Sequence, residues 1–182
     1  MRIREANEDD AGGIAALLRE MVDIRSIASE PAETTAMNVE ANLRLARASA
    51  ASTVLVAESS EGHIAGYCAV HWIPFLFFAG GEGYITELFV RPDDSGKGIG
   101  SALLDTVMAD ARKRGCARLS LLNGRDGESY QRNFYAQRGW VERERMANFI
   151  CPLSNSHKRS WMERQQNDTL LCQGGTFPDD PL

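Results

Sequence analysis

The sequence has little that would direct this chain to a membrane or to nucleic acid. No apolar run in its 182 residues approaches the roughly 18–20 residues needed to cross a bilayer. The opening MRIREANEDD is charged where a secretory signal would be apolar. The 20 basic residues are outnumbered by 25 acidic ones, and the pI of about 5.3 argues against a dedicated nucleic-acid binder. We therefore expect a cytoplasmic protein that has neither a membrane nor a nucleic acid as its partner.

Groups of metal-ligating residues are also missing. The four cysteines are scattered without a C-x-x-C pair, and the three histidines do not add a cluster with the spacing of a metal site. In a chain of this length such cysteines are expected to stay reduced, not to form a disulfide or zinc framework. The sequence therefore predicts no metal cofactor.

The composition is that of an ordinary globular domain, with 43% hydrophobic and 25% charged residues. Residues 1–152 are predicted to form one domain. Residues 153–182 are mostly polar, contain a Gly-Gly pair and end in PDDPL, so we expect them to be a loosely attached tail.

Hydrophobic periodicity predicts an α/β fold. Runs of β-rich or alternating residues indicate strands, and apolar residues three and four apart indicate helices, the first of them capped by Asp9 or Asp10. The predicted strands are 2–4, 53–58, 63–72, 84–90, 117–122 and 140–150. The first predicted helix begins near residue 11, and three further helices span 32–50, 99–114 and 129–138.

The most informative segment is a strand, a glycine-rich turn, a long helix and a second strand, from Tyr84 to Leu122. A helical crossover joins parallel strands, so these two strands should be parallel neighbours. Glycines at the start of the helix allow a ligand to approach the backbone, and the free N–H groups there attract an anion. The spacing fits neither the Walker loop nor the Rossmann fingerprint, and an ordinary glycine-rich helix start is the alternative.

Further motifs decide between these interpretations. Leu88-Phe89-Val90-Arg91-Pro92 precedes the turn, Lys97-Gly98-Ile99-Gly100-Ser101-Ala102-Leu103-Leu104 opens the helix, and Asn133-Phe134-Tyr135-Ala136-Gln137-Arg138-Gly139-Trp140 follows. In this order and spacing they resemble the GCN5-related N-acetyltransferase (GNAT) family, whose signature is [Q/R]-x-x-G-x-[G/A]. The resemblance covers about residues 1–151.

The resemblance implies a single-domain fold with a mixed, mostly antiparallel sheet flanked by helices, in which the central parallel strands splay apart around acetyl-CoA. Backbone groups of the strand would contact the pantetheine arm, and the glycine-rich turn would hold the pyrophosphate. The cofactor-binding residues that it implies are Leu88, Phe89, Val90, Ser95, Gly96, Lys97, Gly98, Ile99, Gly100, Ser101 and Glu128.

Two of these residues depart from the family pattern. Ser95 stands where the family usually has Arg or Gln, which removes one donor to the pyrophosphate, and Lys97 is a candidate to replace part of that charge. Glu128 stands where many members have an Asn that contacts the cofactor. It therefore adds negative charge near the cleft.

Glu87 is the candidate general base. It is the only titratable side chain within its apolar strand, where alternation would put it on one face with Ile85 and Phe89. An amine must lose a proton before it attacks a thioester at neutral pH, and a carboxylate can accept that proton directly or through water. The alternatives are an anchor for a cationic substrate and a structural ion pair.

Tyr135 is the candidate general acid, because the resemblance places that role at this tyrosine. A phenol is protonated at neutral pH and can donate to the departing thiolate. The alternative is a packing residue that hydrogen-bonds the cofactor sulfur without transferring a proton.

The acceptor is expected to be a small cationic amine bound between the first two helices and the loop 73–83. Glu82, Glu87 and Glu128 would favour it if they converge. The apolar residues 75–78 of this loop are interpreted first as core or homodimer contacts and second as part of the acceptor site. Three alternative functions stay open: a protein N-terminal or lysine acetyltransferase, a non-catalytic CoA-binding sensor, and a protein-interaction module.

Overall fold

The computed structural model describes residues 1–21, 30–77, 79–151 and 153. The chain divides into two compact units, of which the first ends at Gly127 and the second begins at Glu128. The first unit holds the five-stranded sheet and its flanking helices. Apart from Leu153, the predicted tail 153–182 lies outside the described residues.

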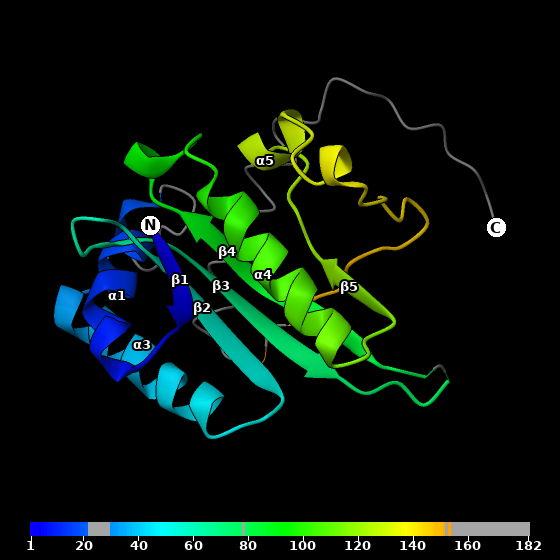
Figure 1. Ribbon diagram of the computed structural model, residues 1–182, viewed down its shortest axis with the longest axis horizontal. Coiled ribbons are helices and arrows are strands. Elements are labelled where there is room, and N and C mark those ends of the chain that lie inside the picture. Colours follow the sequence, from blue (N-terminus) through cyan, green and yellow to red (C-terminus); the bar gives the residue numbers. More distant parts are fainter. Residues whose placement is uncertain (22–29, 78, 152, 154–182) are drawn as a thin grey trace. The chain divides into compact units, whose positions relative to one another are not determined.

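The sheet is mixed, as the sequence predicts. Its strands lie in the order β1-β2-β3-β4-β5, with antiparallel pairing from β1 to β4 and parallel pairing between β4 and β5 (Figure 1). The parallel pair arises because the chain crosses over through a helix between these two strands. The strands are β1 (Arg2–Glu5), β2 (Ser52–Glu58), β3 (Ile64–Ile73), β4 (Glu82–Val90) and β5 (Arg118–Leu121).

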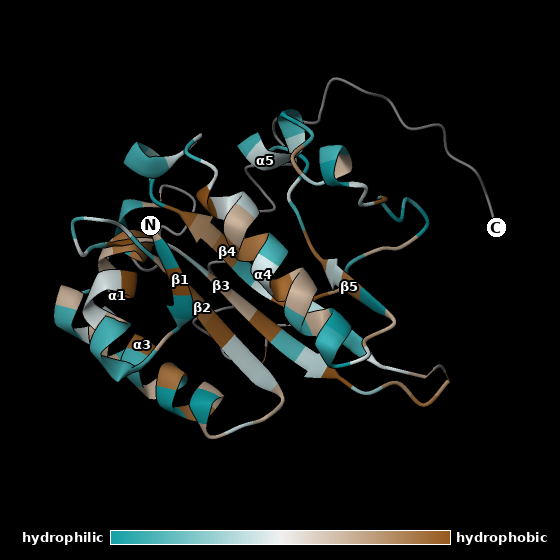
Figure 2. Cartoon of the chain, viewed as in Figure 1, coloured by the Kyte–Doolittle hydropathy of each residue, from teal (hydrophilic) through white to brown (hydrophobic). Residues whose placement is uncertain are grey.

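Helices cover both faces of the sheet. On one face α1 (Ala11–Glu20) and α3 (Ala32–Arg47) pack on β3 and β2. On the other face α4 (Ile99–Lys113) lies along β3 and β4 (Figure 1). Figure 2 shows the reason: hydrophobic residues fill the central strands and alternate with hydrophilic residues along the helices.

The first helix begins differently from the prediction. Asp10 occupies the N-cap position of α1, one of the two predicted positions, but its side chain makes no capping hydrogen bond; the Asn7 side chain accepts from the Asp9 N–H and starts a short 3-10 turn, η1 (Glu8–Asp10). The buried Asp10 carboxylate accepts the Asn7 N–H at 2.8 Å and two bonds from Arg4 at 2.7 Å. Hydrogen bonding from Arg4 lowers the pKa of Asp10. The acid therefore ties β1 to α1.

The second unit is less regular than the sequence predicts. The predicted continuous helix over 129–138 is wrong: a short helix α5 (Glu128–Gln131) and a 3-10 turn η3 (Ala136–Arg138) are separated at Asn133, whose φ of 56° is left-handed. The predicted strand 140–150 is also wrong. All residues from 141 to 150 are exposed and none is paired in the described sheet, so this segment lacks the partner strand that a β conformation requires.

Candidate active site

One edge of β4 is open over half of the strand. Residues 82–85 of β4 pair with 118–121 of β5, whereas β3 pairs with β4 along nearly its whole length. The N–H of Arg91, which follows β4, donates to a carbonyl of β3 at 2.8 Å. Since successive residues direct their main-chain groups to alternate edges, those of Leu88 and Val90 face away from β3. The predicted splay of the parallel strands is confirmed.

A bulge at Thr86 lies where the pairing with β5 ends. Ala69 and Val70 of β3 oppose Glu87 and Ile85 respectively, so Thr86 has no counterpart. Cross-strand partners share a face and neighbouring residues do not, so Glu87 and Ile85 lie on opposite faces. The prediction that simple alternation puts them on one face is wrong, because the bulge adds one residue. Ile85 is buried on the α4 face, and Glu87 lies on the face that carries α1 and α3.

The candidate base is exposed but is held by a buried tyrosine. The Tyr67 hydroxyl donates to Glu87 Oε2 at 2.6 Å, and the Tyr67 side chain is only 2% exposed. Tyr67 lies in the core cluster formed by α1, α3 and the sheet, with its ring 5.7 Å from that of Phe89. The sequence did not point to Tyr67, because its partner comes from the next strand. Only the strand register brings the two residues together.

Glu82, the other acid on this face of β4, is in a different state. It is 4% exposed, and it accepts from Arg118 Nε at 2.9 Å, Arg118 Nη2 at 2.6 Å and the Ser120 hydroxyl. The negative charge of Glu82 is therefore matched by Arg118 across the parallel strands. This pairing with Arg118 argues against the expected role of Glu82 in attracting a cationic acceptor.

The glycine-rich turn before α4 has the geometry of an anion cradle. Gly96 and Gly98 have φ of 77° and 81°, and nothing lies within 4 Å of a Cβ built on either. Ser95 to Gly98 are exposed, and α4 starts at Ile99 without a side-chain cap. The N–H groups of a first helical turn have no acceptor within the helix. This open backbone suits the phosphates of a nucleotide-like cofactor.

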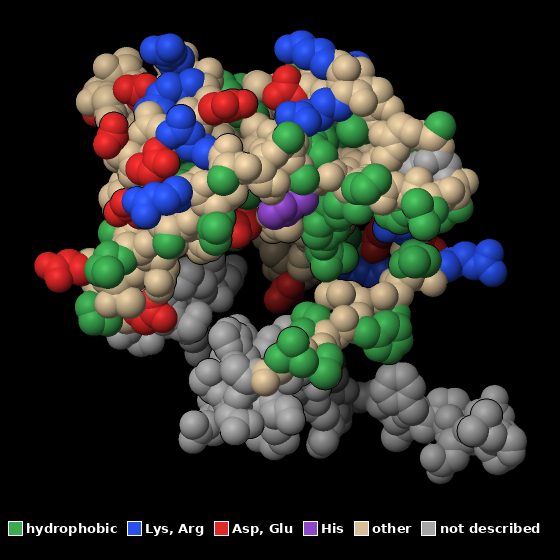
Figure 3. Space-filling view, turned by 90° about the horizontal axis from the view of Figure 1, so that it is seen from below, with side chains coloured by type: hydrophobic (Ala, Val, Ile, Leu, Met, Phe, Trp, Pro, Cys, Tyr) green, Lys and Arg blue, Asp and Glu red, His purple; other side chains and the backbone are tan. Residues whose placement is uncertain are grey.

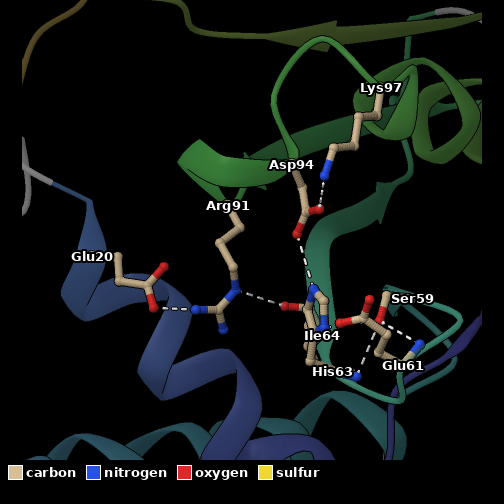
Figure 4. Close-up of polar contacts among 8 residues, drawn as sticks. All are labelled: Glu20, Ser59, Glu61, His63, Ile64, Arg91, Asp94 and Lys97. Atoms are coloured by element: carbon tan, nitrogen blue, oxygen red, sulfur yellow. Dashed lines mark hydrogen bonds and ion pairs between the residues drawn. The ribbon is translucent and has the colours of Figure 1, made fainter.

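Lys97, the candidate replacement for the family's Arg or Gln, is engaged by a neighbouring acid (Figure 4). Its ammonium lies 2.8 Å from Asp94 Oδ1, and the other Asp94 oxygen lies 3.0 Å from His63 Nε2. The His63 ring in turn contacts the Ser59 hydroxyl at 2.9 Å. Hydrogen bonding by Lys97 and then by His63 lowers the pKa of Asp94, and Asp94 raises the pKa of Lys97. The turn is thus tied to the β2–β3 connection, while the Lys97 side chain stays 62% exposed.

The end of β4 is tied down by Arg91 as well. Its Nε donates to Ile64 O at 3.2 Å, and its guanidinium pairs with Glu20 at the end of α1 (Figure 4). These contacts join α1 and β3 to the residue that follows β4. They hold in place the segment that joins the open edge to the glycine-rich turn.

The connection between β3 and β4 is apolar and largely exposed. Leu76 and Phe77 are exposed, the Phe75 and Phe77 rings meet edge-on at 5.2 Å, and Arg118 lies over the Phe75 ring. Figure 3 shows hydrophobic side chains gathered on the right, where this connection lies. Burial in the core, one of the two first interpretations, is therefore wrong for Leu76 and Phe77. Phe78 lies outside the described residues.

Tyr135, the candidate acid, belongs to the second unit. Its ring packs against Phe134 at 5.0 Å and Trp140 at 5.7 Å between centroids. The chain turns after it through Gly139, whose φ is 78°. Glu128 is the first residue of α5 in the same unit. The motif residues Phe134, Tyr135, Gly139 and Trp140 therefore form a packed turn that carries Tyr135.

Two findings concern membranes and metals in the part of the chain that the structure describes. No helix in this part of the chain is both long and apolar enough to span a bilayer. In the same residues, no group of three or more His, Cys, Asp or Glu side chains could hold a metal ion.

Comparisons with known proteins identify the class. The sequence model of the acetyltransferase (GNAT) family matches residues 18–140, and the chain belongs to this family. It is therefore an acetyl-transferring enzyme, and enzymes of this family take the acetyl group from acetyl-CoA. The confirmed splay and the open glycine-rich turn agree with this assignment.

Two relatives and one solved structure are similar to this chain. The thialysine N-epsilon-acetyltransferase of Bos taurus is 29% identical over 130 residues, which cover 65% of this chain and 72% of that protein. The L-methionine sulfoximine/L-methionine sulfone acetyltransferase of Pseudomonas paraeruginosa is 32% identical over 114 residues, covering 62% and 64%. The solved structure of a transcriptional regulator from Bacillus halodurans C-125 has a TM-score of 0.71 at 24% identity, covering 82% and 99%, and shows the shared fold alone.

Proposed function

We propose that this enzyme transfers an acetyl group from acetyl-CoA directly to the primary amine of a small cationic molecule, with both substrates bound at once. The observation that carries the proposal is the neighbourhood of three features on β4 and its continuation: an open strand edge, an exposed carboxylate and a glycine-rich anion cradle. Holding both reactants in one groove supplies much of the rate acceleration of such a transfer.

The open edge and the turn would hold acetyl-CoA. Main-chain groups of Leu88 and Val90 would pair with the amides of the pantetheine arm beside Phe89, and one N–H of this segment would stabilise the oxyanion of the tetrahedral intermediate. The N–H groups of the turn from Ser95 to Ser101, with Gly96, Gly98, Ile99 and Gly100 between them, would hold the pyrophosphate. Lys97, held by its ion pair with Asp94, would add a positive charge near the pyrophosphate. Glu128 would lie on the pantetheine side.

Glu87 would accept the proton of the amine, directly or through one water. Its exposure gives an acceptor access to the carboxylate, and among the described residues its partner is the neutral Tyr67 and not a cation. The same carboxylate would attract an ammonium group. Tyr135 would donate a proton to the departing thiolate of CoA, and a Tyr135→Phe variant with undiminished turnover would exclude this role.

The small-molecule acceptor is supported by the names of the relatives, which act on thialysine or on methionine sulfoximine and sulfone. Glu87 supports a cationic acceptor. The alternatives are a protein N-terminus or lysine as acceptor, and a CoA-binding protein without turnover. Thiol release measured with a panel of small amines, including thialysine, and with lysine peptides separates these three.

Cofactor binding is tested first, by thermal unfolding with and without acetyl-CoA. A ligand at about 100 times its Kd stabilises the native state by about 2.7 kcal/mol, so the melting temperature should rise clearly. Gly98→Glu puts a side chain and a negative charge into the cradle and should weaken binding by about 10-fold or more.

The matched control for this variant is Gly115→Glu. Gly115 has a φ of 68° and equally open surroundings, but it follows α4 at the end opposite the cradle. Both substitutions strain the backbone in the same way. Equal affinities in the two variants would exclude the turn as the phosphate site.

A further inference from the structure

Tyr67 is a buried titratable side chain that the proposed chemistry does not yet use. Tyr67 lies on β3 opposite Phe89. Phe89 is two residues after Glu87 on β4, so all three side chains lie on the same face of the sheet. Its ring is packed with the core residues of α1 and β2, and its hydroxyl reaches Glu87 Oε2 at 2.6 Å. The bond therefore runs from a rigid, dry part of the molecule to an exposed carboxylate.

A core position by itself calls for an apolar ring, and phenylalanine would pack there without a polar group to satisfy. A buried tyrosine hydroxyl needs a partner, and here that partner is the candidate base. The ring is fixed by its packing, so the hydroxyl fixes one oxygen of an otherwise mobile glutamate side chain. Among the described residues no donor contacts the second oxygen, Oε1, which is the one left for the acceptor.

The chemical type of the donor matters as much as its position. Glu82 is matched by a guanidinium, whereas Glu87 is matched by a neutral phenol that orients it without cancelling its charge. Burial, followed by the negative charge of Glu87, raises the pKa of Tyr67, so the phenol keeps its proton and stays a donor at neutral pH.

We infer that Tyr67 is a positioning residue, whose hydroxyl holds Glu87 with Oε1 directed to the amine acceptor. This inference rests on the proposed role of Glu87 in acetyl transfer. It adds a residue outside the family motifs on which the Glu87 role was based, and it assigns that residue an effect on the acceptor rather than on acetyl-CoA.

The test is Tyr67→Phe, which keeps the ring and removes only the hydroxyl. We expect kcat/KM for the acceptor to fall by about 10-fold to 100-fold, because a hydrogen bond to a charged, reacting group is lost. The affinity for acetyl-CoA and its thermal shift should not change. Tyr130→Phe is the matched control, because Tyr130 donates to Glu142 at 2.8 Å in another tyrosine–glutamate pair. It should retain wild-type kcat/KM.

A double-mutant cycle with Glu87→Gln separates positioning from a general loss of structure. If Tyr67 acts through Glu87, then Tyr67→Phe should cause little further loss of kcat/KM in the Glu87→Gln background. The inference would be overturned if the double variant lost kcat/KM by the product of the two single losses, or if Tyr67→Phe were as active as wild type. In either case the proposed function would stand. Wild-type kcat/KM for Glu87→Gln would instead overturn the role of Glu87, and the inference with it.

Discussion

The two halves of β4 carry one glutamate each on the same face, and these two acids differ in burial and in the charge of their partners. In the half paired with β5, Glu82 is buried and its charge is matched by Arg118. In the half beyond the bulge, Glu87 is exposed and its partner is the neutral Tyr67. One strand thus holds a structural acid and a candidate catalytic acid five residues apart.

The difference follows from strand pairing. Where β5 lies alongside, it supplies Arg118 and Ser120, and a buried carboxylate with these partners is stable only as part of that network. Beyond the end of β5, the described residues place only the Tyr67 hydroxyl against Glu87 and no cation, so the Glu87 carboxylate stays exposed. The end of the strand pair therefore separates a buried, charge-matched glutamate from an exposed one, and only the exposed one fits the proposed catalytic role.

The largest effect is expected from Glu87→Gln. This substitution keeps the shape of the side chain and one oxygen that can accept from Tyr67, but it removes the carboxylate that would accept a proton. We expect kcat/KM for acetyl transfer to fall by about 100-fold to 10,000-fold, with the melting temperature close to that of wild type. Steady-state thiol release and a thermal melt measure both quantities. If Glu87→Gln were less stable than wild type but fully active per folded molecule, Glu87 would be the structural acid and the proposed catalytic role would be excluded.

Glu82→Gln should show the complementary behaviour. It removes a buried charge and leaves Arg118 with a weaker partner, so the free energy of unfolding should fall by about 2 kcal/mol. The value of kcat for the folded enzyme should stay within a few-fold of wild type. Urea denaturation measures the first quantity. A large loss of kcat at unchanged stability would mean that Glu82 belongs to the chemistry after all.

The smallest effect concerns alkaline pH. Burial, followed by the charge of Glu87, raises the pKa of Cys68 from 9.0 to about 12, and burial raises that of Tyr67 as well. The unfolded chain releases these protons first. The stabilisation from these two groups is therefore complete below about pH 8 and falls as pH rises, by about 1 kcal/mol between about pH 8 and about pH 9.5.

Chemical denaturation across this pH range checks the prediction. The slope should be shallower in Cys68→Ala, which has no thiol to titrate, and in Glu87→Gln, which lacks the charge that raises the pKa. A free energy of unfolding that stays flat up to about pH 10 in the wild type would contradict it.

Much of the first unit could be predicted from local patterns. The apolar spacing of residues 99–113 indicated α4, and the β-rich runs indicated β2, β3 and β4 to within two residues. The glycines of the turn and the position of Glu87 in an apolar strand indicated the candidate site. These features depend on residues near one another in the sequence, and their spacing records the helical and strand periods directly.

Prediction was weaker where the conformation depends on distant partners. Residues 140–150 are rich enough in strand formers to suggest a strand, but no described strand pairs with them. The bulge at Thr86 could not be predicted, because it exists only in the register between β3 and β4. The pairing of Lys97 with Asp94 was also missed. An exposed lysine can pair with an acid or be solvated by water, and sequence spacing does not distinguish these two states.

For this protein, three motifs in the sequence were sufficient to indicate the acetyltransferase family by resemblance, because each motif is contiguous in the chain, and the family model confirms the family. The state of each acid was established only by contacts between elements. Tyr67 and Arg118 come from the strands on either side of β4, and the bulge determines which face Glu87 presents. Charge and burial depend on neighbours in space, so these properties arose only when the sheet was assembled.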